Sequence, residues 1–134
     1  MTKTETVLRS IFGSCRSDIR PLAYAVDIAI ELMFVQGIPM DDILVTNDIY
    51  PDVAKRIRKK SGAHPSAKSA SRRIERLANK CWDAMVSRDL VVKYIGAPLE
   101  DIRAPRDVIF YLAFYSYLST PFFTALESQP ALLF

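Results

Sequence analysis

The sequence predicts an all-α fold, in a single compact domain of about six helices. Apolar residues recur at the three- and four-residue spacing of an amphipathic helix through most of the chain. No segment shows the alternation of apolar and polar residues that is typical of a half-buried strand. The length of 134 residues and the 50% hydrophobic content suit one core but not two ordinary domains. We expect the domain to span 1–121, followed by an apolar C-terminal tail at 122–134.

Capping and breaking residues delimit the first two helices. Thr2 and Glu5 form a capping box, and the helical spacing that follows continues to Gly13. A polar link then leads to a second helix, which begins near Pro21 and ends before Gly37. Because this second helix is apolar around most of its circumference, we expect its neighbours to bury it at the centre of the domain.

The middle of the chain predicts helices separated by polar breaks. A short helix is expected over 40–45, with a break at 46–48. A helix over 51–60 begins with a proline, whose missing N–H costs nothing at a first helical position. Glycine and proline make 61–68 a loop, and a long amphipathic helix begins at Ser69. Its apolar face consists of Ala70, Ile74, Leu77, Ala78, Cys81 and Met85, with Val86 at the margin.

The last third of the chain predicts two more helices. Residues 90–95 form a short apolar helix, and 96–104 are a linker. A proline and an aspartate start the last helix near Pro105, and Pro121 ends it. The tail after it, at 122–134, has no clear periodicity, so it either frays or docks on the body or on a second copy.

Composition excludes several classes of protein. A single histidine and two cysteines cannot build a zinc finger, and isolated glycines exclude a phosphate-binding glycine loop. His64 lies in a polar loop and Cys81 on an apolar face, and nothing near Cys15 marks a nucleophile. We therefore expect no cofactor, no metal and no enzyme activity. A group of acids is read as a solvated helix end rather than a Mg²⁺ site: Asp41, Asp42, Asp48 and Asp52.

A long uncharged stretch at 108–126 raises the question of a membrane helix. Hydroxyl groups and Pro121 interrupt it, and it lacks the basic flanks of an inserted span. These features favour a buried or partner-contacting helix, with no membrane partner. The N-terminus has no apolar run of a signal peptide, and the cysteines show no disulfide framework. We expect a cytoplasmic protein.

The charges are strongly segregated along the chain. Residues 55–80 hold ten bases and the single acid Glu75, a net charge of +9. The remaining residues hold eight bases and fourteen acids, a net charge of −6. A domain with this polarity presents one positive face, and the usual partner of such a face is a polyanion.

The basic segment predicts a helix-turn-helix with an elongated turn. In such a unit the N-terminal residues of the second helix reach base edges in the major groove of double-stranded DNA. The alternative is a solvated helix face, because arginine and lysine are good exposed helix formers. The expected contacts on the second helix are Ser69, Ser71, Arg72, Arg73, Glu75, Arg76 and Lys80. The remaining basic contacts are Lys55, Lys59, Lys60 and Lys68.

Three motifs resemble a known family in the same order. Residues 50–55 (YPDVAK), 71–76 (SRRIER) and 87–88 (SR) look like the C-terminal DNA-binding effector domain of sporulation initiation response regulators, the stage zero sporulation protein A family. Residues 11–24 are similar to the segment that follows the first helix in that family. The likeness spans roughly 7–118.

The resemblance implies an all-helical domain that binds DNA upstream of promoters, regulates transcription and contacts RNA polymerase. Arg73, Glu75 and Arg76 match the family's base- and phosphate-contacting residues. Asn79 and Lys80 stand where the family has an arginine and a histidine, so we expect a similar but chemically altered role for them.

The chain departs from the family pattern in three ways. It holds no counterpart of the phosphorylatable receiver domain, so we expect no phosphorylation switch. The link between the two helices is much longer than the family's turn, and its lysines either reach phosphate or the minor groove or loosen the two-helix unit. Asp89 stands where the family has a glycine, so the helix is expected to end differently.

A protein-interaction module is the alternative function. Such a domain would pair with an intact regulator or an acidic partner without reading DNA itself, and the long loop and the aromatic last helix favour it. The aromatic side chains of that helix either fill the core or form a homodimer contact. They are Phe110, Tyr111, Phe114, Tyr115 and Tyr117.

Overall fold

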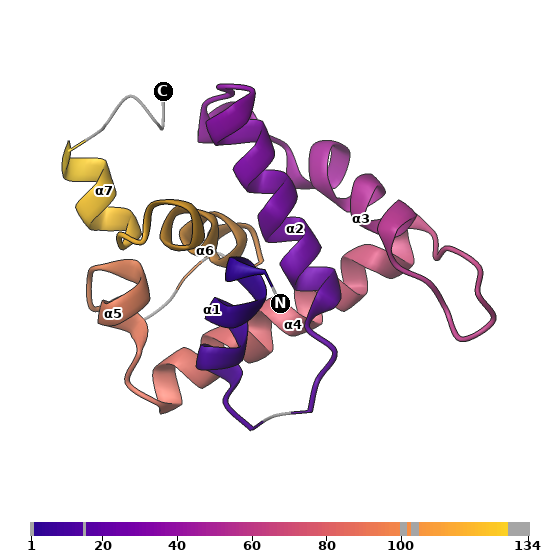
Figure 1. The fold of residues 1–134 in the computed structure, drawn as a ribbon, viewed down its shortest axis with the longest axis horizontal. Coiled ribbons are helices and arrows are strands. Elements are labelled where there is room, and N and C mark those ends of the chain that lie inside the picture. The colour runs from indigo at the N-terminus through magenta and orange to yellow at the C-terminus, as the bar shows by residue number, and fades with distance from the viewer. Residues whose placement is uncertain (1, 15, 100–101, 103–104, 129–134) are drawn as a thin grey trace.

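The computed structural model describes residues 2–14, 16–99, 102 and 105–128 (Figure 1). Within these residues the regular structure is entirely helical, which confirms the predicted all-α class and the single domain. The α-helices are α1 (Lys3–Phe12), α2 (Arg20–Ile30), α3 (Tyr50–Arg56), α4 (Ala67–Ser87), α5 (Val91–Ile95), α6 (Arg106–Leu118) and α7 (Phe122–Ser128).

Helix α2 lies at the centre of the domain, as its apolar circumference predicts. It contacts α1, α3, α4 and α6, and Figure 1 shows it between α6 on one side and α3 on the other. Leu22, Ala25 and Val26 of α2 have no exposed surface. Phe110 and Phe114 of α6 are the largest fully buried side chains, so the core lies chiefly between these two helices.

Both predicted ends of α1 are confirmed. The Thr2 hydroxyl accepts a hydrogen bond from the Glu5 amide at 3.1 Å, so Thr2 is the N-cap. Gly13 follows the last turn with φ +64° and ψ −128°, a conformation that side chains rarely adopt. Its amide donates to the Arg9 carbonyl oxygen, which closes the helix.

The segment between α2 and α3 differs from the prediction. A π-helical turn, Glu31–Val35, extends α2, and a 3₁₀ turn, Met40–Asp42, replaces the expected helix over 40–45. The predicted break at 46–48 is wrong, because a second π-helical turn, Val45–Ile49, runs through it into α3. Asp48 lies within this turn, and its carboxylate accepts a hydrogen bond at 2.8 Å from the amide of Leu44, the residue just before the turn. The carboxylate thus caps the N-terminal end of the turn.

The last helices confirm two further predictions and resolve one alternative. Residues 90–95 do contain a short helix, α5, and α6 covers most of the predicted last helix. Of the fates proposed for the tail, docking on the body holds for α7, which contacts α5 and α6. Phe122 of α7 is buried and meets Phe114 edge to face, with ring centroids 4.9 Å apart. Residues 129–134 lie outside the described residues.

The aromatic residues of α6 divide between the core and the surface. Phe110 and Phe114 are buried, whereas Tyr117 is 50% exposed and stacks on Phe34 with ring centroids 4.4 Å apart. The prediction that Val86 belongs to the apolar face of α4 is wrong, because its side chain is 53% exposed. The other predicted residues of that face are buried, and burial raises the pKa of Cys81 to about 12. Cys15 lies outside the described residues.

No single helix in the described part of the chain is long and apolar enough to cross a membrane. Helices α6 and α7 pass that length and composition test only as a pair, and they are bent by 66° at the break between them. The bend falls at Ser119–Pro121, where the proline cannot continue α6.

Candidate nucleic-acid interface

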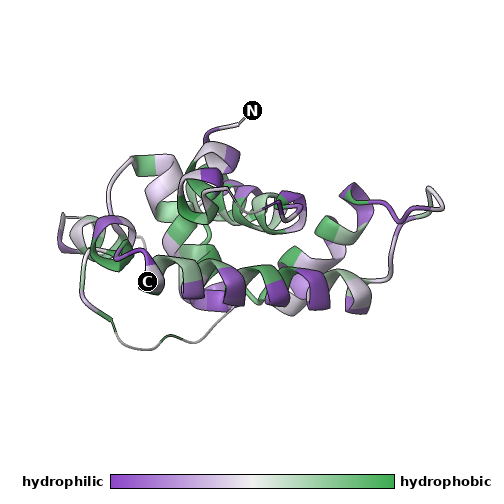
Figure 2. Ribbon diagram, turned by 90° about the horizontal axis from the view of Figure 1, so that it is seen from below, coloured by the Kyte–Doolittle hydropathy of each residue, from purple (hydrophilic) through white to green (hydrophobic). Residues whose placement is uncertain are grey.

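Helix α4 forms one side of the molecule with a polar outer face. It is the long helix along the lower edge of Figure 2, where hydrophilic residues line the outward side and hydrophobic residues face the body. Ala70, Ile74 and Cys81 have no exposed surface, and α1, α2, α3 and α6 cover them. The predicted spacing of apolar residues therefore fixes which basic residues point to solvent.

Helix α4 begins earlier than the sequence predicts. Its first residue is Ala67 rather than Ser69, because the Ser66 hydroxyl accepts from the Ser69 amide at 3.1 Å and caps the helix. Ser69 and Ser71 consequently lie inside the helix, and the Ser71 hydroxyl donates to the Lys68 carbonyl oxygen at 2.8 Å. The basic residues Arg72 to Arg76 fall in the second and third turns instead of the first two, which corrects the prediction.

The loop between α3 and α4 is held together by its own hydrogen bonds. Helix α3 ends at Arg56, so the predicted extension to residue 60 is wrong. The Lys59 amide donates to the Ala63 carbonyl oxygen at 2.8 Å, and the Arg58 guanidinium donates to the Gly62 carbonyl oxygen at 2.8 Å. The His64 ring nitrogen Nδ1 lies 2.9 Å from the Ile57 carbonyl oxygen. Residues 57–66 thus form a defined loop, which holds Lys59 and Lys60 in solvent.

The expected contact residues differ in how far they reach into solvent. Glu75 is half-buried, and after burial its charge is the second cause that raises the pKa of Tyr50 in α3 to about 12. Ser69, Ser71 and Arg73 are also half-buried. The exposed set is Lys55, Lys59, Lys60, Lys68, Arg72, Arg76, Asn79 and Lys80.

A basic cleft of about 680 Å³ lies between the start of α2, the end of α3 and the second turn of α4. A second cleft of about 270 Å³ adjoins it along α4, toward Lys80. Arg73 and Asp18 line both clefts. The remaining residues that line the larger cleft are Arg20, Tyr24, Arg56, Ile57, Arg58, Lys59 and Lys60.

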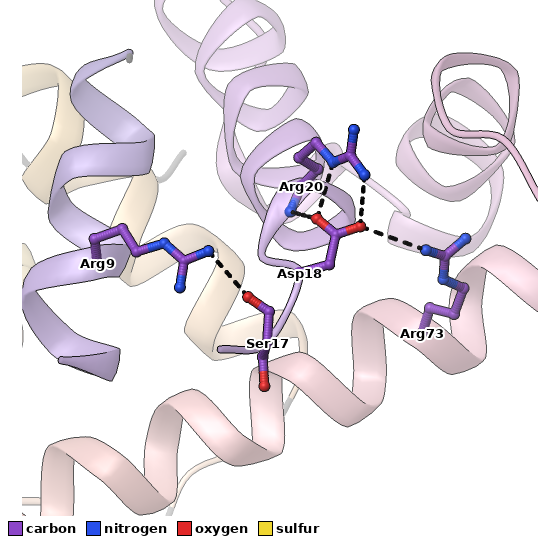
Figure 3. Close-up of polar contacts among 5 residues, drawn as sticks. All are labelled: Arg9, Ser17, Asp18, Arg20 and Arg73. Atoms are coloured by element: carbon purple, nitrogen blue, oxygen red, sulfur yellow. Dashed lines mark hydrogen bonds and ion pairs between the residues drawn. The ribbon is translucent and has the colours of Figure 1, made fainter. Parts of the chain in front are cut away.

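Asp18 joins the linker before α2 to helix α4 (Figure 3). Its Oδ1 accepts from the Arg20 amide at 3.1 Å and from Arg20 Nε at 2.9 Å, and its Oδ2 accepts from Arg20 Nη2 at 3.0 Å. The same Oδ2 lies 3.9 Å from Arg73 Nη2. The hydrogen bonds from Arg20, with a smaller contribution from the Arg73 charge, hold the pKa of Asp18 below its usual value.

Neighbouring contacts fix the linker beside α4. Arg9 of α1 donates from Nη2 to the Ser17 carbonyl oxygen at 3.0 Å, as Figure 3 also shows. The Ser17 hydroxyl in turn lies 3.4 Å from Lys80 Nζ. The structure therefore places the linker along the edge of α4 that carries Arg73 and Lys80.

Sequence reasoning missed part of this surface. Arg20, Arg56 and Arg58 line the larger cleft, although none of them was among the predicted contacts. The position of Arg56 and Arg58 within the basic segment is a signal that could have found them. No local signal places Asp18 against Arg73, because the two residues are far apart in the chain and meet only through the packing of α2 on α4.

No protein-family model, curated protein or solved structure shows significant similarity to this chain. Among the described residues, no group of three or more histidine, cysteine, aspartate or glutamate side chains could hold a metal ion.

Proposed function

We propose that this protein binds double-stranded DNA and regulates transcription, with α3 and α4 acting as a helix-turn-helix that has an elongated turn. One observation carries the proposal. The outer face of α4 and the loop before it present exposed basic residues from a segment of net charge +9, in a chain whose remainder carries −6. Such a face attracts a polyanion and orients the molecule as it approaches.

The dimensions of α4 suit the major groove. A helix with its side chains is about 10–12 Å in diameter, and the groove is about 12 Å wide. Arg72, Arg76 and Asn79 are exposed on α4 and are our candidates for contacts with base edges. Arginine donates two hydrogen bonds to guanine, whereas asparagine donates one hydrogen bond to adenine N7 and accepts one from the adenine N6 amino group. The lysines of the 57–66 loop would bind the phosphate backbone beside them.

The resemblance of 50–55 and 71–76 to sporulation effector domains is consistent with this proposal and is the reason for choosing transcription as the process. In that interpretation α3 packs across the back of α4, and the two helices are in contact in the structure. The elongated turn is the main departure, and its folded loop extends the basic surface past the start of α4.

The test is a fluorescence-anisotropy titration of a random-sequence duplex at several salt concentrations. If about five phosphates are neutralised, the logarithm of the association constant falls against that of salt with a slope near −4.5, about −0.9 per phosphate. Lys93→Ala is the control variant and should bind as the original protein does, because Lys93 is an exposed lysine on α5, outside the basic segment. An absence of binding at low salt, or an affinity independent of salt, would falsify the proposal.

A protein partner is the second candidate function, favoured by two exposed apolar side chains. Val86 near the end of α4 is 53% exposed, and Val92 in α5 is 56% exposed. Exposed apolar side chains on consecutive helices offer a surface that a partner can cover. Gel filtration over a range of protein concentrations tests self-association, and Val86→Ser with Val92→Ser should abolish any association that this surface supports.

A further inference from the structure

The two basic clefts share one acidic group. Among the described residues that line them, Asp18 is the only acid, and it faces both clefts together with Arg73. The surrounding side chains include five other bases in the larger cleft: Arg20, Arg56, Arg58, Lys59 and Lys60. A single carboxylate thus lies among the cations that would attract an incoming anion.

The contacts of Asp18 are those that a phosphate would make. Arg20 grips the carboxylate with Nε and Nη2, one nitrogen on each oxygen, at 2.9 and 3.0 Å. Guanidinium groups bind carboxylate and phosphate oxygens with this same two-point geometry. Arg73 approaches the Oδ2 atom from the side of α4, at 3.9 Å. The carboxylate therefore lies between two guanidinium groups from different elements.

The ion pair between Asp18 and Arg73 is the contact that can exchange. Its 3.9 Å separation exceeds hydrogen-bond length, and the two side chains are 43% and 33% exposed. Partly exposed pairs of this length contribute little to stability, so an external anion can replace one partner without unfolding the linker. The Arg20 contacts are shorter and include the backbone amide, so they would keep Asp18 attached to the start of α2.

We propose that the Asp18 carboxylate stands in for a phosphate group of the DNA backbone, and that this cleft is a phosphodiester-binding site that DNA fills by displacing Asp18 from Arg73. This inference rests on the proposed function. It adds the linker before α2 and the Arg20 side chain to the DNA-binding surface, and it makes Asp18 an internal competitor that weakens binding.

The test compares Asp18→Asn with Asp42→Asn in the duplex titration. Both substitutions remove one negative charge, but Asp42 is an exposed residue of the 3₁₀ turn and lines neither cleft. Asp18→Asn should tighten binding about fivefold, the equivalent of one exposed ion pair. The salt slope should stay the same in Asp18→Asn, because DNA makes this phosphate contact in both proteins once Asp18 has been displaced. Asp42→Asn should change affinity less than Asp18→Asn and leave the slope unchanged.

Two further variants show which arginine takes up the phosphate. Arg73→Ala should weaken binding more in the Asp18→Asn background than in the original protein, because only there is Arg73 free of its internal partner. Arg20→Gln should weaken binding in both backgrounds. Thermal unfolding of each variant identifies any loss of affinity that comes from loss of fold.

The outcomes separate this inference from the proposed function. If the original protein binds duplex DNA and Asp18→Asn behaves like Asp42→Asn, the competitor role is overturned and DNA binding stands. Weaker binding by a folded Asp18→Asn variant would mean that Asp18 supports the interface rather than competing for it, which also overturns the inference. If neither protein binds duplex DNA at low salt, the proposed function fails and the inference fails with it.

Discussion

The Arg88 guanidinium, just after the end of α4, lies against the backbone of Ile11 in the last turn of α1. Its Nη1 atom donates to the Ile11 carbonyl oxygen at 2.6 Å and to the neighbouring Ser10 carbonyl oxygen at 3.0 Å. The last carbonyl groups of a helix have no partner within the helix, and a cation there also interacts favourably with the helix dipole. One side chain thus joins the ends of two helices.

Arg88→Ala should lower the free energy of unfolding by about 1–2 kcal/mol, because it removes two charged hydrogen bonds to backbone carbonyls. Urea denaturation followed by circular dichroism measures the change. Arg72→Ala serves as the control, since Arg72 is exposed on α4 at a distance in sequence from this junction. Equal stability of the two variants would contradict a role for Arg88 at the helix ends.

Gly13→Ala should destabilise the protein by about 2 kcal/mol, because its φ of +64° and ψ of −128° suit only glycine. A Cβ atom at this position would also lie 2.9 Å from Arg88 Nη1. Gly37→Ala is the matched control, since Gly37 has a φ of +72° and no heavy atom within 4 Å of such a Cβ. Chemical denaturation should show a larger loss for Gly13→Ala. That excess should shrink when Arg88→Ala is added, and an unchanged excess would exclude the clash as its cause.

Asp89→Gly should stabilise the protein by about 0.5–1 kcal/mol. Asp89 has a φ of +56°, a left-handed conformation that strains most side chains and that glycine adopts freely. The sequence suggests an altered helix end at this position, yet the backbone there is one that glycine would suit. Asp83→Gly, within α4, should instead destabilise the protein by about 0.3 kcal/mol, the difference in helix propensity between aspartate and glycine. A lower melting temperature for Asp89→Gly than for the original protein would contradict this account.

Replacing Asp27 or Asp18 by asparagine should change the free energy of unfolding in opposite directions as pH rises. Burial raises the pKa of Asp27, partly offset by the hydrogen bond from Thr4 at 2.6 Å and by the charge of Arg56. The stabilisation that this raised pKa of Asp27 contributes to the folded state is present below the unfolded pKa and is lost as pH rises through the folded pKa. Asp27→Asn should therefore gain stability relative to the original protein as pH rises from 3 toward neutrality, a range that brackets the usual value of 3.8.

Asp18 should behave in the opposite way, because the hydrogen bonds from Arg20 lower its pKa. Its contribution is present above the unfolded pKa and is lost as pH falls through the folded pKa. Asp18→Asn should therefore lose stability relative to the original protein as pH rises. Denaturant midpoints of the three proteins across the acid range test both aspartates, and parallel curves would contradict the assignment.

On DNA, two basic residues should act differently. Arg76→Ala, on the exposed face of α4, should relax sequence preference at one position and cost about 1–3 kcal/mol on a selected site. Lys59→Ala, in the loop, should weaken every sequence alike and reduce the salt slope by about 0.9. Sites selected from a random duplex library provide the specific target. If Lys59→Ala changed sequence preference as much as Arg76→Ala, the assigned roles would be wrong.

Most of the fold could be predicted from local features of the sequence. The Thr2 cap, the Gly13 end and the apolar stripe from Ala70 to Met85 each follow from residue type and spacing, so the sequence predicts α1 and α4 with small errors at their ends. The start of α4 was misplaced because two serines compete as N-caps, and Ser66 holds the Ser69 amide. The π-helical turn before α3 was missed because the Asp48 carboxylate satisfies a backbone amide within a segment of helix-breaking composition.

The candidate site was predictable only in part. The exposed bases of α4 follow from the position of its apolar stripe, which the sequence contains. The cleft cannot be predicted from that stripe, because it forms only where the linker before α2 lies against α4. That contact results from the packing of three helices. Arg73 shows the difference, since its spacing indicates an outward side chain and its actual neighbour is Asp18.

The folded loop at 57–66 has a consequence for the thermodynamics of association. Because its backbone is already closed by the hydrogen bonds of Lys59, Gly62 and Arg58, and because Ile57 and Pro65 anchor its base, the loss of chain entropy occurs when the protein folds. A partner that binds Lys59 and Lys60 therefore meets a loop that is already ordered, so binding loses little further conformational entropy. Inserting glycines beside Gly62 would leave the loop unordered before binding, so that the loss of chain entropy would occur on binding instead. The complex should then be weaker, although the charge of the protein is unchanged.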